Sequence, residues 1–173
     1  MTRHSSKQDL RKFVKDERKK IDIKSISKNL LEKLIETADY KEARNIMIFY
    51  PLKYEVDLLE ILNDDTKNFY LPRVEGETLL CCPFKKDTEL SKSCFKINEP
   101  LTKAVDKTIL DLIVVPALAV DRNNYRLGYG RGFYDRFLKD LDCKKIVCIS
   151  KDFILDTVYP EDYDIKVDCI LSI

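Results

Sequence analysis

The chain places three of its four glycines in one pentapeptide, Gly128 to Gly132, and uses glycine almost nowhere else. Glycine tolerates positive φ angles and lets backbone N–H groups approach a ligand without a Cβ in the way. Residues 109–116 before it form an apolar run typical of a buried parallel strand, and residues 133–138 after it have apolar side chains at helical spacing. A glycine loop that leads into a helix N-terminus is suited to anions, because free N–H groups and the helix dipole point at the ligand. The pattern therefore predicts an α/β unit that grips a polyphosphate.

Charged and aromatic neighbours support this interpretation, since Arg126, Arg131, Tyr134 and Asp135 lie in or beside the glycines. The alternative is a glycine-rich turn that only joins one element to the next. The G-x-G-x-G spacing is neither the dinucleotide-binding fingerprint nor a Walker loop, because no Gly-Lys-Ser or Gly-Lys-Thr follows. By itself the loop indicates an anion and no particular reaction.

Strand-like and helix-like segments alternate along the chain, which predicts an α/β layered domain with a largely parallel sheet. We expect helices at 5–20, 26–38, 55–63 and 135–141, and strands at 45–50, 68–71, 78–84, 109–115, 145–149 and 167–173. Residues 91–101 are expected to form a loop or a hairpin. We expect residues 1–173 to form a single domain, with ligands beyond the carboxyl ends of the strands.

Composition narrows the possible functions. The net charge of +1 gives no global field for nucleic acid or a membrane surface, and no apolar run approaches transmembrane length. Six cysteines without a C-x-x-C pair favour reduced thiols in a cytoplasmic protein. Because His4 is the only histidine and lies in a polar N-terminal stretch, the sequence argues against metal sites with several histidines and against a Ser-His-Asp triad. Lysines, arginines, carboxylates, tyrosines and a hard metal remain, and this set suits phosphoryl transfer.

The same residues carry a family resemblance. Val-Val-Pro-Ala-Leu-Ala-Val-Asp at 114–121, followed by Arg126 to Leu138, resembles the signature of the 5-formyltetrahydrofolate cyclo-ligase (methenyltetrahydrofolate synthetase) family. The Lys7 and Arg11 pair, the segment from Tyr50 to Asp57 and the segment from Asp164 to Asp168 resemble further parts of that family. The resemblance extends from about Lys7 to Ile173, and the glycine loop is its most specific part.

The resemblance implies a three-layer Rossmann-like sandwich related to sugar-phosphate isomerases and CoA-transferases. It implies ATP- and Mg²⁺-dependent cyclisation of 5-formyltetrahydrofolate to 5,10-methenyltetrahydrofolate, with ADP and phosphate as the other products. A monomer is the expected state. Two alternatives stay open at this point: a non-catalytic module that binds nucleotide or folate, and a sugar-phosphate isomerase of similar fold.

The resemblance also implies roles for individual residues. The expected ATP contacts are Lys7, Arg11, Arg126, Leu127, Gly128, Tyr129, Gly130, Arg131, Gly132, Phe133 and Tyr134. The expected folate contacts are Tyr50, Glu55, Tyr129, Gly130, Arg131, Gly132 and Phe133. Asp135 and Asp168 are the expected Mg²⁺ ligands, and Arg131 and Tyr134 the expected catalytic residues.

Several of these residues have a plainer interpretation. Lys7 and Arg11 project from one helical face, but the lysines around them favour a solvated basic face when the resemblance is set aside. Glu55 could simply open a helix and interact with its dipole, or its two carboxylate oxygens could accept the adjacent N–H donors of a pterin. For Asp121 and Asp164 the favoured interpretation is a loop or capping role.

Overall fold

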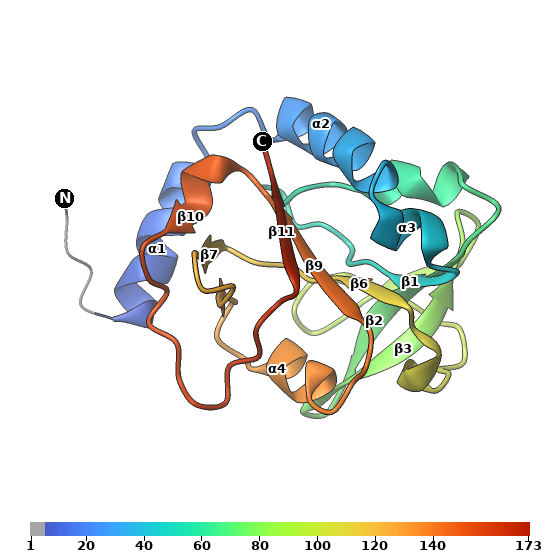
Figure 1. Ribbon diagram of the computed structural model, residues 1–173. Coiled ribbons are helices and arrows are strands. Elements are labelled where there is room, and N and C mark those ends of the chain that lie inside the picture. The colour runs from blue at the N-terminus through green and yellow to red at the C-terminus, as the bar shows by residue number, and fades with distance from the viewer. Residues whose placement is uncertain (1–5) are drawn as a thin grey trace.

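The computed structural model describes residues 6–173, so His4 lies outside the described part of the chain (Figure 1). Its centre is a six-stranded sheet in the order β11-β9-β6-β1-β2-β3. The strands are β1 (Asn45–Met47), β2 (Asn68–Glu75), β3 (Thr78–Phe84), β6 (Leu112–Val114), β9 (Lys144–Ile149) and β11 (Cys169–Ser172). Every neighbouring pair is parallel except the β2–β3 hairpin, which turns at Gly76. The predicted mixed α/β fold with a largely parallel sheet is confirmed.

Helices cover both faces of this sheet, because its central strands are apolar on both sides. Ile46 packs in one core with Leu30 of α2 (Ile23–Ile35) and Tyr40 of α3 (Ala38–Glu42). Met47, the next residue of β1, packs in the other core with α1 (Lys7–Arg18) and α4 (Phe133–Leu138). The period-two alternation of a strand thus sends neighbouring residues into separate cores.

A small second sheet, in the order β10-β7-β8, carries the glycine loop. It comprises β7 (Ala119–Asp121), β8 (Arg126–Leu127) and β10 (Ile154–Leu155). The loop therefore follows a short antiparallel strand rather than the long apolar strand that the sequence suggested. Asp121 fixes the β7–β8 turn, since its Oδ1 accepts from the backbone N–H groups of Asn123 (2.9 Å) and Tyr125 (3.1 Å). Its expected turn role is confirmed.

Several element boundaries differ from the sequence-based expectation for local reasons. The second helix stops at Ile35, because Thr37 caps α3 by accepting from the Tyr40 N–H. Residues 55–63 contain only a 3₁₀ turn at Leu59–Asn63, because Ser27 Oγ and the Asp57 carboxylate take up the N–H groups of Asp57 and Leu59.

The remaining elements differ less. The uncertain region 91–101 is a hairpin of β4 (Leu90–Lys92) and β5 (Asn98–Pro100). The apolar run at 109–115 enters the sheet only at Leu112, since a 3₁₀ turn at Lys107–Ile109 comes first.

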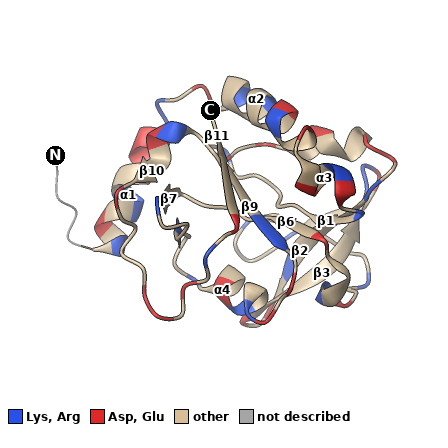
Figure 2. Ribbon diagram, in the orientation of Figure 1, with Lys and Arg blue, Asp and Glu red and all other residues tan. Residues whose placement is uncertain are grey.

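In residues 6–173 we find no helix of the length and apolarity needed to cross a membrane. Charges of both signs are spread over the elements, so anion recognition has to be local (Figure 2).

Candidate active site

A cavity of about 380 Å³ opens beyond the carboxyl ends of β1 and β6, within the size range of small-molecule sites. Segments far apart in the sequence line it: α1, the stretch after β1, the β2–β3 hairpin, residues 95–99, the glycine loop and residues 161–164. The expected site residues that line it are Lys7, Arg11, Tyr50, Glu55, Arg126, Leu127, Gly128, Tyr129, Gly130, Arg131, Gly132, Phe133, Tyr134 and Asp135. Asp168 is the expected site residue that does not.

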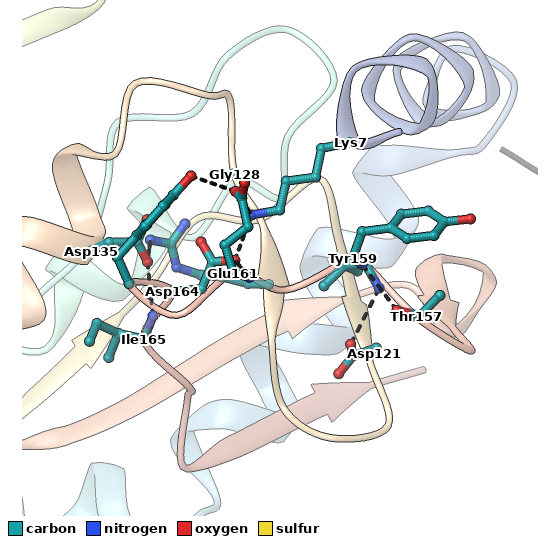
Figure 3. A network of polar contacts seen from close by, with 12 residues as sticks. Lys7, Asp121, Gly128, Asp135, Thr157, Tyr159, Glu161, Asp164 and Ile165 are labelled. Carbon is teal, nitrogen blue, oxygen red and sulfur yellow. Dashed lines mark hydrogen bonds and ion pairs between the residues drawn. The ribbon is translucent and has the colours of Figure 1, made fainter. Parts of the chain in front are cut away.

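Helix α1 brings its predicted pair of cations to this cavity. Ser6 caps the helix by accepting from the Asp9 N–H, so the helix begins at Lys7. Arg11 Nε donates to the carbonyl of Gly128 at 2.8 Å. The Lys7 Nζ donates to Glu161 Oε2 at 2.8 Å and to Asp164 Oδ2 at 2.5 Å (Figure 3). A solvated basic face is therefore wrong for Lys7 and Arg11.

The glycine loop needs its glycines for conformation and for close approach. Gly130 has φ of 100° and Gly132, which caps α4, has φ of 68°, both in the range that glycine favours. A Cβ on Gly130 would lie 3.2 Å from Arg11 Cζ. The bare backbone thus lets the Arg11 guanidinium sit against the loop.

Arg126 is a buried cation whose Nε–H donor has no hydrogen-bond partner among residues 6–173. Its guanidinium donates from Nη2 to Asp135 Oδ1 at 3.1 Å and lies over the Tyr134 ring. Burial lowers the pKa of Arg126, and the Asp135 carboxylate opposes this shift. Its Nε makes no hydrogen bond within residues 6–173, although the residue is only 6% exposed. An orphaned donor on a buried cation is costly, so an anionic ligand in this cavity fits it well.

Two carboxylates lie beside these cations. Asp135 Oδ1 accepts from Arg126 and from the Ile165 N–H, while its Oδ2 carries no hydrogen bond within the described residues (Figure 3). Asp164 caps its loop by accepting from the Glu161 N–H at 2.7 Å, as expected, but it also lines the cavity and binds Lys7. The capping interpretation of Asp164 was therefore incomplete.

The structure does not bring Asp168 to Asp135. Asp168 precedes β11, and its Oδ2 accepts from the N–H of Lys145 in β9 at 2.7 Å. This contact ties together the amino ends of two parallel strands, whereas the cavity lies beyond the carboxyl ends. The predicted pairing of Asp135 with Asp168 in one metal site is corrected accordingly. No cluster of three or more potential metal-ligating side chains (His, Cys, Asp, Glu) occurs in residues 6–173.

Glu55 lies deep in the cavity wall and is 7% exposed. It does not open a helix, so the helix-dipole alternative is wrong. Instead its Oε2 accepts from the Leu52 N–H at 2.7 Å and its Oε1 accepts from the Tyr129 hydroxyl. Burial raises the pKa of Glu55, and these hydrogen bonds and the Arg18 guanidinium partly oppose the shift.

Sequence reasoning missed some residues of this region. Phe95 packs against Phe133 with ring centroids 5.8 Å apart, and the Arg131 guanidinium lies over the Phe95 ring. Arg18, at the end of α1, is buried with its guanidinium over the Phe153 ring. The spacing of Leu10, Val14 and Arg18 could have found it, because position 18 continues the buried stripe of α1.

The fold is that of an α/β protein, and its cavity is lined by a glycine loop, by buried and half-buried cations and by a buried carboxylate. This combination defines a protein suited to bind an anionic small molecule. Comparison with known proteins makes this class specific. The model of the 5-formyltetrahydrofolate cyclo-ligase family matches residues 3–172, and the chain belongs to that family. It is therefore a ligase of folate one-carbon metabolism, in a family of ATP-dependent enzymes.

Three relatives illustrate the match. The 5-formyltetrahydrofolate cyclo-ligase of Haemophilus influenzae is 30% identical over 121 residues, covering 65% of each chain. That of Escherichia coli K12 is 33% identical over 142 residues, covering 75% of this chain and 78% of the relative. The solved structure of Aquifex aeolicus 5,10-methenyltetrahydrofolate synthetase superimposes with a TM-score of 0.85 at 28% identity, over 96% of this chain and 89% of that one.

Proposed function

We propose that the chain cyclises 5-formyltetrahydrofolate to 5,10-methenyltetrahydrofolate at the expense of ATP, releasing ADP and phosphate. Besides family membership, one observation carries this proposal: a single loop contacts both a cation and a buried carboxylate of the cavity wall, and we assign these two contacts to two halves of the cavity. The Gly128 carbonyl holds Arg11 on the cationic side, and the Tyr129 hydroxyl holds Glu55 on the other. A nucleotide polyphosphate and a pterin would then meet at residues 128–133. We also propose that residues 3–172 act as one cyclo-ligase domain, a three-layer Rossmann-like sandwich related to sugar-phosphate isomerases and CoA-transferases.

The cationic half is assigned to ATP. Lys7, Arg11 and Arg126 line it, and the unpaired Nε of the buried Arg126 supports an anionic partner. Charge-assisted hydrogen bonds from such groups, with the loop N–H groups, would hold the polyphosphate. Arg131 would offset charge on the transferred phosphoryl group, and Tyr134 lies under the Arg126 guanidinium.

The carboxylates at the cavity suit Mg²⁺, which rarely binds to protein ligands alone. This cation usually takes one or two carboxylates together with water and phosphate oxygens. We assign that role to Asp135 and Asp164, which both line the cavity. When bound there, the ion would neutralise phosphate charge during phosphoryl transfer.

The other half is assigned to the folate. The two oxygens of Glu55 match adjacent N–H donors of a pterin edge, and Tyr50 lies in the same wall for ring contact. The formyl oxygen, an amide-like oxygen, is a poor leaving group. Transfer of the γ-phosphoryl group to it creates a good one, N10 attacks the activated carbon, and phosphate departs with that oxygen as the five-membered ring closes.

The two alternatives are less well supported. A sensor of nucleotide or folate needs no carboxylates beside the phosphate-binding cations, and a sugar-phosphate isomerase needs no ATP. Membership in a family of cyclo-ligases favours the ligase over both.

Opposite effects of two substitutions test the division of the cavity. Glu55→Gln exchanges one acceptor for a donor, so KM for 5-formyltetrahydrofolate should rise about ten- to a hundredfold while KM for ATP hardly changes. Lys7→Met should do the reverse, with a rise in KM for ATP of about tenfold. Steady-state kinetics with each substrate varied in turn provide the measurement.

Lys19→Met is the control, because this lysine lies at the other end of the same helix, away from the cavity, and its side chain is 54% exposed. It should leave both constants unchanged. Equal losses for ATP and folate in Glu55→Gln would reject the assignment of Glu55 to the pterin.

A further inference from the structure

Arg18, the last residue of α1, is buried although it lies among solvated lysines. It is 3% exposed, whereas the side chains of Lys19 and Lys20 are 54% and 66% exposed. Its guanidinium lies over the Phe153 ring, and its Nε and Nη1 make no hydrogen bond within residues 6–173. An unsatisfied buried cation is costly, so packing alone is a poor reason to have arginine here.

The surroundings of Arg18 indicate what its charge acts on. The acidic groups that interact with it electrostatically are Glu55 and the Tyr129 hydroxyl. The Tyr129 hydroxyl donates to Glu55 Oε1 and also interacts with the Arg18 side chain, so it links the guanidinium to the carboxylate. The other titratable group that senses Glu55 is Tyr134, whose pKa burial raises, and Lys15 Nζ lies over the Tyr129 ring 5.3 Å from its centroid. The buried Arg126 lies over the Tyr134 ring, but the cation that acts on Glu55 itself is Arg18.

We propose that Arg18 is a positioning residue that keeps Glu55 ionised and its Tyr129 contact aligned, so that the cavity offers a charged acceptor edge to the substrate. The proposal rests on the proposed role of Glu55 in binding the folate. Arg18 would then act on the folate half of the cavity through Glu55 and Tyr129, without touching the substrate. The Glu55 carboxylate is the form that accepts two N–H donors, and its burial works against that form.

The sign of the expected pH effect follows from this arrangement. Folate binding weakens when the pH falls through the pKa of Glu55, because a protonated carboxyl offers one acceptor fewer. Loss of the positive charge of Arg18 raises this pKa further, so the weakening begins at higher pH. We expect a shift of the acid transition by about one pH unit, which means about tenfold weaker folate binding below the transition. At high pH the variant should return to the wild-type KM.

The experiment measures KM for 5-formyltetrahydrofolate against pH in Arg18→Met, Arg18→Lys and the wild type. In Arg18→Met the rise in KM for 5-formyltetrahydrofolate at low pH (the acid limb) should begin about one pH unit higher than in the wild type. Arg18→Lys should restore the wild-type position, and KM for ATP should keep its pH profile in both variants. Lys19→Met, which removes an exposed charge from the same helix end, should not move the limb. A merely structural role would raise KM at every pH or affect both substrates.

Two further measurements keep the outcomes distinct. If Arg18→Met does not fold, Arg18→Gln takes its place, and NMR titration of the Glu55 side chain in wild type and Arg18→Lys should give the same pKa. Coincident pH profiles of wild type and the uncharged variant would overturn the role of Arg18, with the function of Glu55 untouched if Glu55→Gln still weakens folate binding. An inert Glu55→Gln would instead reject the proposed function of Glu55.

Discussion

Asp135→Asn and Asp164→Asn are expected to displace the Mg²⁺ dependence of turnover to concentrations about ten- to a hundredfold higher, whereas Asp168→Asn leaves it in place. Each of the first two removes a negative charge from the cavity while keeping a side-chain oxygen of similar shape. A weakened metal site can still be filled by mass action, so excess Mg²⁺ should recover part of the rate. The Asp168 carboxylate accepts a hydrogen bond from the Lys145 backbone N–H, and an asparagine oxygen can accept the same bond.

The three variants differ in their expected stability, so a loss of turnover through unfolding can be told apart from a loss of Mg²⁺ binding. Asp164→Asn leaves Lys7 paired with Glu161, so its melting temperature should change little. Asp135→Asn removes the counter-ion of the buried Arg126 and should lower the free energy of unfolding measurably. Mg²⁺ titration of turnover with thermal melts of each variant provides the check. Three superimposable titrations would leave the metal without its proposed ligands, and a large shift in Asp168→Asn would restore that residue as a candidate.

Arg126→Ala is expected to lower kcat/KM for ATP by about ten- to a hundredfold, the value of one or two charge-assisted phosphate contacts. It also leaves Asp135 without its cation in a half-enclosed site, so the free protein should melt at a lower temperature than the wild type. Arg126→Lys keeps the charge but loses the planar guanidinium. Its kcat/KM for ATP and its melting temperature should lie between those of the wild type and Arg126→Ala.

A thermal-shift measurement separates ATP binding from stability in these variants. Saturating ATP stabilises a folded protein that binds it, so wild type should melt higher with ATP than without. Because the stabilisation depends on the logarithm of the affinity, this increment should be clearly smaller in Arg126→Ala and intermediate in Arg126→Lys. An undiminished increment in Arg126→Ala would remove this residue from the phosphate site.

The sequence predicted the glycine loop well, because glycine and arginine chemistry is local. Gly130 and Gly132 have the positive φ angles that the pattern suggested, and Arg126 faces the same cavity. The sequence could not reveal that the loop is held by β7 and β8, since the two residues of β8 are too few to show a period.

Longer-range relations were beyond sequence patterns for a geometric reason. Asp164 and Asp168 are four residues apart, and an extended chain covers about 13 Å over that distance, enough to leave one at the cavity and the other at the amino end of β11. The place of Glu55 depends on Tyr129, which is remote in sequence. The burial of Arg18 continues the apolar stripe of α1, but its interaction with Tyr129, more than a hundred residues away, has no sequence signal.

The most direct test of the account is an omission experiment on the purified protein. Incubation with 5-formyltetrahydrofolate, ATP and Mg²⁺ should produce the absorbance of 5,10-methenyltetrahydrofolate, with one ADP formed for each product molecule. Omission of ATP or of the folate should abolish the signal, and chelation of Mg²⁺ should suppress it. Methenyl product formed without ATP, or no product from the complete mixture with folded protein, would contradict the account.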